Sequence, residues 1–475
     1  MSEFAPTIGR WWVASAPSDH VPGYIDRDLD STGGPWRLMV EGRLAELPEP
    51  GYDRHLTIHG DTVLGQFTLE RALPSRLLGR LDDSEAQIWH GWQLIKGGHV
   101  EDGQRFRAAV FRLPHLWDWI GPVGLNYHTL GATLRSRPTP DDPGEALSAV
   151  LRDESRVTLG RNFVRTVGTT GESWEGYGVY GVHREKGVSL DELEGLTLAL
   201  ARLHSILSAT PMGSYGVTLG LGADEAGRRL EVVDPDSPSG VEWGRGSLRD
   251  PFFDTAEIAF EPFIRAWIRL HEDATGAMAA AAPRDDRQFV TSKLIETCNG
   301  VEELAALEWD PPEASDEDTN VLTLLKAGSV SRDLRDFVGF HLRLRRWSLA
   351  DKLERLAGLA GPESVAWLLG PSISEWARLV SRLRNSLAHG KKLPGGLSDD
   401  MPFVITAQFS ATAVLRLALL RLAGYENPLS KAPGELLWSG GKPVVGHPNS
   451  DLFHEFETVA SYSRQWKVWL DRLGD

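Results

Sequence analysis

The chain of 475 residues is 41% hydrophobic and 24% charged, so it is long enough for two ordinary domains with their own cores. This composition excludes a disordered chain, a collagen and a coiled coil. The 50 basic and 66 acidic residues give a net charge of −16, so any contact with nucleic acid must be a local patch. A single cysteine, Cys298, excludes an internal disulfide framework and a thiolate zinc cluster.

The first residues, MSEFAPTIGRWWV, lack the basic start and the apolar run of a signal peptide. No uncharged stretch reaches membrane-spanning length. We therefore expect a soluble, cytoplasmic protein that makes no membrane contact.

The first half of the chain alternates apolar and polar residues, as half-buried β-strands do. Strands are predicted at residues 10–15, 36–44, 56–72, 87–96, 105–113, 156–167 and 173–183. Gly, Asp and Pro clusters separate these segments, and their spacing predicts an antiparallel β-sandwich or barrel.

A single helix is predicted to interrupt the strands at residues 190–207, where leucines recur at helical spacing. We expect this helix to pack on the edge or the face of the sheet. Two short strands follow at 217–221 and 230–233, and the Pro-, Gly- and Ser-rich stretch 234–251 is typical of a linker. We place the domain boundary in this stretch, with a β-rich domain at 1–245 and a helical domain at 246–475.

Beyond the linker the hydrophobic period changes from two to 3.6. Asp254 and Glu257 match a capping box, and an apolar stripe follows from Ile258 to Ile268. Further helices are predicted at 289–307, 320–356, 363–369, 373–388, 402–422 and 451–473. The predicted fold class is α+β, with an antiparallel β domain and its packed helix followed by an all-α bundle.

The common nucleotide, metal and hydrolase signatures are missing. Gly440, Gly441 and Lys442 are similar to the end of a phosphate loop, but Pro443 replaces the required Ser or Thr. No second histidine follows His454-Glu455 at zinc-protease spacing, and no G-x-S-x-G elbow occurs. We therefore expect no metal and no cofactor.

One segment of the helical half, SRLRNSLAHGKK at residues 381–392, combines residues that suit chemistry on a phosphate. It ends a predicted helix with Ser372 or Ser374 as its cap and Gly390 at the left-handed position after it. Asn385 and His389 are four residues apart and share a face, so the amide can orient the imidazole. Arg384 turns to the neighbouring side.

An Arg and a His with four to six residues between them are weak evidence by themselves, since composition alone predicts roughly three or four chance matches. Arg54/His59, Arg265/His271 and Arg335/His341 are such matches. Only Arg384/His389 adds an adjacent Asn, a helix end, a small residue before the His and a Gly after it.

Two stretches of the sequence resemble parts of known families. Residues 384–389, RNSLAH, resemble the R-x4–6-H motif of the HEPN superfamily, in the RN-x3-H form found among its ribonucleases. Residues 40–44 and 58–74, together with the helix at 190–207, resemble the N-terminal domain of ApeA-type bacterial anti-phage proteins.

The resemblance implies a metal-independent endoribonuclease that acts as a homodimer through its HEPN domain and cuts tRNA or other host or phage RNA during abortive infection. It implies catalytic roles for Arg384, Asn385 and His389, and a β domain that senses a phage protein or nucleic-acid trigger or restrains the nuclease. The residue types suit this chemistry. An imidazole exchanges protons near neutral pH, and a guanidinium holds phosphoryl oxygens.

The local charge agrees with a phosphate-binding site. Residues 331–392 hold twelve basic and six acidic residues, a net charge of +6, while the rest of the chain carries −22. Arg382, Lys391 and Lys392 are candidate RNA-binding residues. The alternative is that these cations and the Arg384/His389 pair only complement the negative end of the helix dipole.

Other interpretations stay open. The helical domain could be a non-catalytic HEPN module that binds nucleotide or RNA or serves for dimerisation, with the β domain as the ligand binder. The β domain could also bind carbohydrate, although the cytoplasmic character argues against this. For most of the tryptophans of the first half, packing in the core is favoured over a stacking platform for ligands.

Overall fold

The computed structural model describes residues 5–28, 34–45, 55–74, 86–120, 146–168, 171–221, 229–233, 252–283, 289–310, 316–328, 331–334, 347–370, 372–426, 451–462 and 465–473. The chain divides into two compact units. Unit 1 comprises Met1–His204, Met212–Leu248 and Asp254–Ala256, and unit 2 comprises Ser205–Pro211, Arg249–Phe253 and Glu257–Asp475. The boundary that we predict at residue 245 lies outside the described residues and stays a prediction.

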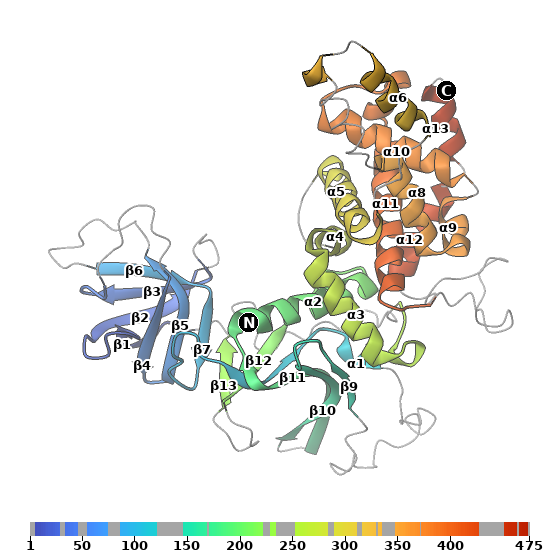
Figure 1. Cartoon of the computed structure of the whole chain (residues 1–475). Helices are drawn as coiled ribbons and strands as arrows, with labels where there is room; N and C mark the ends of the chain where they lie inside the picture. Colours follow the sequence, from blue (N-terminus) through green and yellow to red (C-terminus); the bar gives the residue numbers. More distant parts are fainter. Residues whose placement is uncertain are drawn as a thin grey trace. The chain divides into compact units, whose positions relative to one another are not determined.

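Unit 1 begins with a closed β-barrel (Figure 1). Its strands are β1 (Thr7–Val13), β2 (Val21–Arg27), β3 (Trp36–Glu41), β4 (Leu56–Thr62), β5 (Gly65–Pro74) and β6 (Ala86–Gly91). The antiparallel order is β4-β1-β2-β3-β6-β5, and β4 also pairs with β5, so the six strands leave no free edge. Alternate residues point inward, and Trp11, Trp36 and Trp89 are completely buried in the barrel core. The core role that we favoured is confirmed for these tryptophans.

The sheet continues out of the barrel through β7 (Gln93–Lys96), which pairs with β5. The remaining strands are β8 (Phe106–Arg112), β9 (Leu147–Val150), β10 (Arg156–Gly168), β11 (Gly171–Val188), β12 (Tyr215–Gly220) and β13 (Arg229–Val233). They pair antiparallel in the order β7-β13-β12-β8-β11-β10-β9. Helix α1 (Leu116–Ile120) and helix α2 (Leu190–Ser208) complete this part of unit 1.

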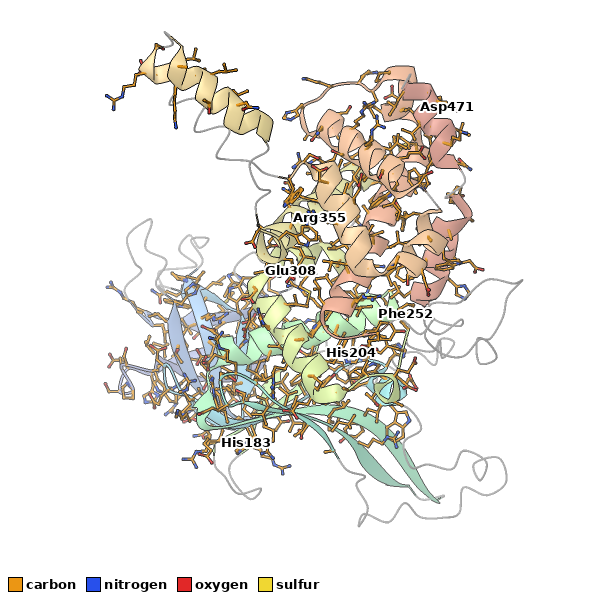
Figure 2. The ribbon with its side chains drawn as sticks, turned by 45° about the vertical axis from the view of Figure 1, so that its right-hand side comes forward. His183, His204, Phe252, Glu308, Arg355 and Asp471 are labelled. Atoms are coloured by element: carbon orange, nitrogen blue, oxygen red, sulfur yellow. The ribbon has the colours of Figure 1, made fainter. Side chains whose placement is uncertain are left out.

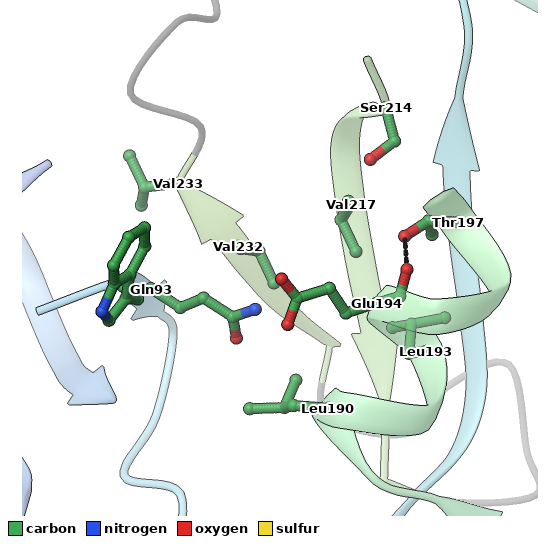
Figure 3. A pocket seen from close by; sticks show the side chains of 10 residues that line it. Gln93, Leu190, Leu193, Glu194, Thr197, Ser214, Val217, Val232 and Val233 are labelled. Atoms are coloured by element: carbon green, nitrogen blue, oxygen red, sulfur yellow. Dashed lines mark hydrogen bonds between the residues drawn. The ribbon is translucent and has the colours of Figure 1, made fainter. Parts of the chain in front are cut away.

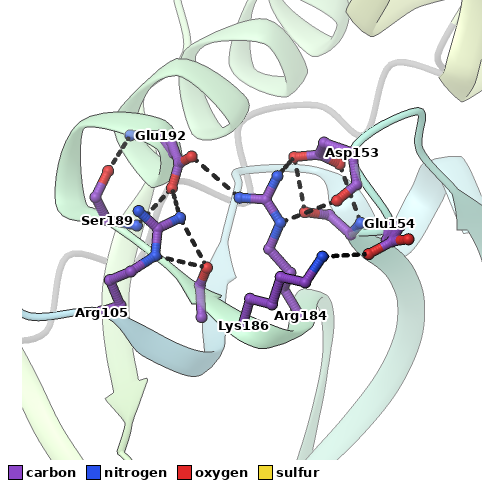
Figure 4. A network of polar contacts seen from close by, with 9 residues as sticks. Arg105, Asp153, Glu154, Arg184, Lys186, Ser189 and Glu192 are labelled. Carbon is purple, nitrogen blue, oxygen red and sulfur yellow. Dashed lines mark hydrogen bonds and ion pairs between the residues drawn. The ribbon is translucent and has the colours of Figure 1, made fainter.

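Polar contacts fix the start of α2 to the sheet (Figure 4). The Glu192 carboxylate accepts hydrogen bonds from Arg105 at 2.6 Å and Arg184 at 3.0 Å, and from the Ser189 main-chain N–H at 2.7 Å. The Ser189 hydroxyl accepts the Glu192 N–H in return, which completes a capping box. Arg184 also pairs with Asp153 before β10, so this one carboxylate network links α2 with three parts of the sheet.

The apolar face of α2 is buried, and its end makes a polar contact inside the core. Leu193, Leu200 and Leu203 are buried, as their spacing predicts. His204, labelled in Figure 2, forms a 3.0 Å hydrogen bond with the Tyr180 hydroxyl on β11, and its ring meets Trp119 of α1 edge-on. The prediction of a helix packed on the sheet is thereby confirmed.

Unit 2 is mostly helical, as predicted. Its helices are α3 (Phe260–Asp273), α4 (Thr275–Ala281), α5 (Val290–Glu308), α6 (Asp316–Ala327), α8 (Leu349–Ala360), α9 (Pro362–Leu369), α10 (Ile373–Ala388), α11 (Met401–Leu422), α12 (Asp451–Tyr462) and α13 (Trp466–Leu473). Short 3₁₀ turns lie at Pro394–Asp399 in unit 2 and at Thr255–Glu257. Helix α11 is central, because α3, α4, α5, α8, α9, α10 and α12 all pack against it.

The apolar character of α11 follows from this position. Among the described residues it is the one helix long and apolar enough to cross a membrane, yet 89% of its most apolar stretch is buried by the other helices. A core helix of a globular protein has the same composition.

Several predicted strands differ from the observed ones. The segment 56–72 is a hairpin, β4 and β5, because Gly65 adopts φ +111° and turns the chain there. Residues 87–96 form two strands that separate at Trp92, and we missed β2 and β9. Helix α1 shows that α2 is not the single helix of the first half.

The helix predictions were wrong at four places. Asp254 and Glu257 do not cap α3, whose N-cap is Ala259; Asp254 accepts the Ala256 N–H instead. The predicted helix 320–356 is interrupted, because Ser348 and Asp351 form a capping box that starts α8. The segment 451–473 contains two helices, α12 and α13, and α4 was missed.

Candidate active site

Helix α10 holds the motif of residues 384–389 and is anchored by its apolar face. Trp376, Val380 and Leu383 are completely buried, and the Trp376 indole N–H donates to the Ser410 hydroxyl of α11 at 2.8 Å. Helices α5 and α8 pack on α10 as well. The register of this helix is therefore fixed, and so is the direction in which the motif residues point.

The two ends of α10 agree only in part with the sequence. Ser372 occupies the N-cap position, as predicted. Its side chain, however, makes no capping hydrogen bond, so that part of the prediction was wrong. At the other end His389 is the C-cap, and Gly390 adopts φ +62°, which confirms the left-handed glycine. The Lys391 N–H then donates to the Ser386 carbonyl at 2.9 Å and closes the helix end.

The Arg384 guanidinium lies against α5 rather than in open solvent. Its Nη2 atom donates to Asn299 Oδ1 at 3.1 Å and lies 3.4 Å from Glu302 Oε2. Lys352 of α8 lies 3.6 Å from the other Glu302 oxygen. Two cations and one carboxylate from three helices thus form a cluster, and the charge that remains on it is positive.

Asn385 and His389 are both exposed at the end of α10. The Asn385 carbonyl oxygen accepts a hydrogen bond from Arg384 Nη1 at 3.2 Å. The expected orientation of His389 by Asn385 is absent, because the imidazole bonds to none of the residues that the structure describes. His389 is therefore accessible to a ligand, and Asn385 positions the guanidinium.

The candidate RNA-binding residues lie at the same helix end. Arg382, Lys391 and Lys392 are exposed, and Lys392 pairs with Asp399 at 3.2 Å across two solvent-exposed side chains. An exposed ion pair of this kind is weak. The Lys392 ammonium can therefore exchange the Asp399 carboxylate for another anion, such as a phosphate.

Some of the twelve basic residues counted in residues 331–392 already have partners in the structure, and others lie outside the described residues. Four of the arginines, at 335, 343, 345 and 346, lie outside the described residues. Arg355, labelled in Figure 2, lies over the Trp347 ring at 3.6 Å, and Lys352 pairs with Glu302. Asp351 forms a capping box with Ser348 at the start of α8.

Cys298 of α5 is completely buried, and the charges of Arg384 and Glu302 act on it. Burial raises the pKa of its thiol to about 12, an effect that the Arg384 charge opposes and the Glu302 charge adds to. The thiol stays protonated at neutral pH, so it cannot act as a nucleophile.

The sequence did not indicate Asn299, Glu302 or Lys352 as neighbours of the motif. A signal existed for two of them, since Asn299 and Glu302 are three residues apart and share one face of α5. Nothing in the sequence indicated which face of α10 they would meet. In the described part of the chain, no three His, Cys, Asp or Glu side chains are grouped as a metal site requires.

Comparison with known proteins gives one match. A family model described as ApeA N-terminal domain 1 matches residues 6–267, which is more than half of the chain. No curated protein and no solved structure matches the chain.

Proposed function

Because the chain belongs to the ApeA N-terminal domain 1 family, which points to anti-phage defence, we propose that it is a cytoplasmic defence ribonuclease of the HEPN type. Unit 2 would contain the nuclease, and unit 1 would sense the infection or restrain the nuclease. The proposed catalytic residues are Arg384, Asn385 and His389.

The observation that supports this proposal most is the arrangement at the end of α10. An exposed imidazole, an amide and a guanidinium lie within six residues of a helix whose other face is buried. Exposed lysines and Arg382 surround them. This combination supports the proposal because an imidazole can carry a proton, a guanidinium or an ammonium can hold a phosphate, and the proposed reaction requires no metal.

The proposed reaction is cleavage of RNA by its own 2′-hydroxyl. A neutral His389 imidazole takes the 2′-hydroxyl proton, and the 2′-oxygen forms a bond to phosphorus. The bond from phosphorus to the 5′-oxygen breaks, and that oxygen takes a proton from an imidazolium. The products are a 2′,3′-cyclic phosphate and a 5′-hydroxyl. Arg384 stabilises the charge on the phosphoryl oxygens.

A homodimer suits this chemistry, because it brings two copies of His389 to one linkage, one as base and one as acid. We propose that the dimer forms through unit 2, that tRNA or another host RNA is cut, and that a phage protein or nucleic acid is the trigger at unit 1.

Incubation of the purified full-length protein with RNA in EDTA tests the proposal. We expect products that end in 2′,3′-cyclic phosphate, and a loss of at least 100-fold in rate for His389→Ala. His454→Ala is the control, because His454 is an exposed histidine of the same unit, on α12. Full cleavage by a folded His389→Ala protein would contradict the assignment, as would equal losses in both variants.

A second candidate function is favoured by the contacts of Arg384. Its guanidinium is already held by Asn299 and Glu302 within one chain, so the motif could bind nucleotide or RNA without turnover. RNA binding that depends on Arg384, with no product at any enzyme concentration, would support this non-catalytic module.

A further inference from the structure

A pocket of about 230 Å³ lies in unit 1, outside the candidate active site (Figure 3). Trp92, which lies between β6 and β7, lines it together with residues of β7, α2, β12 and β13 and with Ser214. The apolar walls are Leu190, Leu193, Val217, Val232 and Val233. This volume is below the range for drug-sized ligands, so the pocket fits a single side chain or a molecule of that size.

The residues that line the pocket carry one negative charge and no positive charge. Figure 3 shows the Gln93 amide and the Glu194 carboxylate directed toward each other across the pocket, from β7 and α2. The Gln93 side chain bonds to no residue within the described ranges. Glu194 is the one charged residue among the ten that line the pocket, and none of the ten is a cation.

The Trp92 indole supplies a large aromatic surface at the mouth, since half of this side chain is exposed. A main-chain hydrogen bond to β5 holds Trp92 in place. The Trp92 main-chain N–H donates to the Glu70 carbonyl at 3.2 Å, and the next residue, Arg71, has φ +52° at an irregularity of the β4–β5 pairing. A non-glycine residue in this conformation is strained, so the local fold stabilises a special geometry here.

The pocket already has one guanidinium at its edge. Arg71 Nη1 lies 3.2 Å from Glu194 Oε2, and Arg71 also pairs with Asp191. Both carboxylates are largely exposed, at 54% for Glu194 and 75% for Asp191. One cation faces two carboxylates, so the edge of the pocket retains negative charge.

We propose that this pocket binds the guanidinium or ammonium end of a basic side chain on a protein partner. The indole of Trp92 covers the cation, Gln93 and Glu194 accept its hydrogen bonds, and the valines and leucines surround its aliphatic stem. A nucleobase would also stack on Trp92, but the one cation described at the edge of the pocket, Arg71, is already paired with Glu194 and Asp191 and is not free for the phosphate of a nucleotide. This site does not depend on ribonuclease activity.

Fluorine NMR of the full-length protein with 5-fluorotryptophan tests this proposal directly. The Trp92 resonance is assigned by its loss in Trp92→Phe. The probes are the Nα-acetyl methylamides of arginine and of citrulline, which is isosteric and uncharged, together with spermidine and guanosine. We expect the arginine probe to shift the Trp92 resonance, and citrulline to bind at least about tenfold more weakly.

Substitution of the carboxylate gives the second arm. Glu194→Gln should weaken the arginine probe roughly tenfold, because a charged acceptor becomes neutral. Glu185→Gln is the matched control, since Glu185 is exposed on β11 outside the pocket, and it should change nothing. Equal binding of citrulline, tighter binding of guanosine or of spermidine, an unaffected Glu194→Gln protein, or no shift with any probe would each overturn the proposal.

Discussion

The Arg384 guanidinium is shared among three acceptors, Asn299, Glu302 and Asn385. Of these three acceptors only Glu302 carries a charge. If RNA binds at Arg384, as we propose, Glu302 holds the guanidinium in position and also repels the RNA phosphate, and Lys352 offsets part of this repulsion.

Replacement of Glu302 by Gln should strengthen RNA binding, because it removes a like charge and keeps a hydrogen-bond acceptor for Arg384. We expect a gain on the order of 1 kcal/mol, which is about fivefold, at low salt and a smaller gain at high salt. Equilibrium binding of a fluorescent RNA to the His389→Ala background measures this. Glu308→Gln, on the exposed end of the same helix α5, is the control. Weaker binding by Glu302→Gln would show that the carboxylate mainly positions Arg384.

His204 makes the stability of unit 1 depend on pH. Complete burial lowers the pKa of this imidazole to about 3, well below its ordinary value of 6.5. The unfolded chain therefore binds a proton that the folded chain does not. The contribution of neutral, buried His204 to the free energy of unfolding is fully present above pH 6.5. As the pH falls from there toward 3, this contribution decreases by about 1 kcal/mol per pH unit.

His204→Gln should remove this part of the pH dependence, since Gln can still bond to the Tyr180 hydroxyl but does not titrate. Urea unfolding at pH 7 and pH 5 measures the loss of stability in each protein. The wild type should lose about 2 kcal/mol more than the variant. An equal loss in both proteins would contradict the buried neutral state of His204.

At the residue scale, sequence predicted the motif but not its surroundings. The exposure of Asn385 and His389 and the left-handed Gly390 follow from local spacing on one helix. Contacts between helices do not, because Glu302 meets Arg384 only through the packing of α5 on α10. The same holds for Trp92 and Glu194, which lie about one hundred residues apart in the sequence and line one pocket.

At the scale of elements, a buried ion pair joins three helices of unit 2. Arg416 of α11 is 5% exposed, its Nε atom donates to the Ala281 carbonyl at 2.7 Å, and its Nη1 atom pairs with Glu455 of α12. The arginine thus ties the end of α4 and the side of α12 to the central helix.

Removal of the carboxylate should cost stability, because the buried guanidinium would keep only the carbonyl partner. We expect Glu455→Ala to destabilise unit 2 by about 2 kcal/mol, below the cost for a fully buried pair because Glu455 is 32% exposed. Thermal unfolding measures this. Glu457→Ala, an exposed carboxylate of the same helix, should have almost no effect. Equal melting temperatures for both variants would argue against the role of this pair.

The elements themselves were predictable where the hydrophobic period was long and regular. Helices α2, α5 and α10 match their predicted ranges to within one residue at each end. Predictions failed where a local turn interrupts a continuous pattern, as at Gly65 between β4 and β5, and at Ser348 before α8. Closure of the barrel depends on the pairing of β4 with both β1 and β5, which no local pattern indicates.

At the scale of the whole molecule, the family match and the motif lie in different parts of the chain. The match to the ApeA N-terminal domain covers residues 6–267, whereas the proposed nuclease residues begin at Arg384. Anti-phage defence therefore follows from the first part, and the reaction is proposed from the second. An experiment that links the two must detect RNA cleavage during infection.

Sequencing of 5′-hydroxyl RNA ends in phage-infected cells is the most direct test of this link. Cells carry the wild-type protein, His389→Ala or His454→Ala, each confirmed to be present at equal amounts. The account predicts new 5′-hydroxyl ends, together with reduced plaque formation, in the wild type and His454→Ala, and neither effect in His389→Ala. Undiminished ends and protection in His389→Ala cells would contradict it.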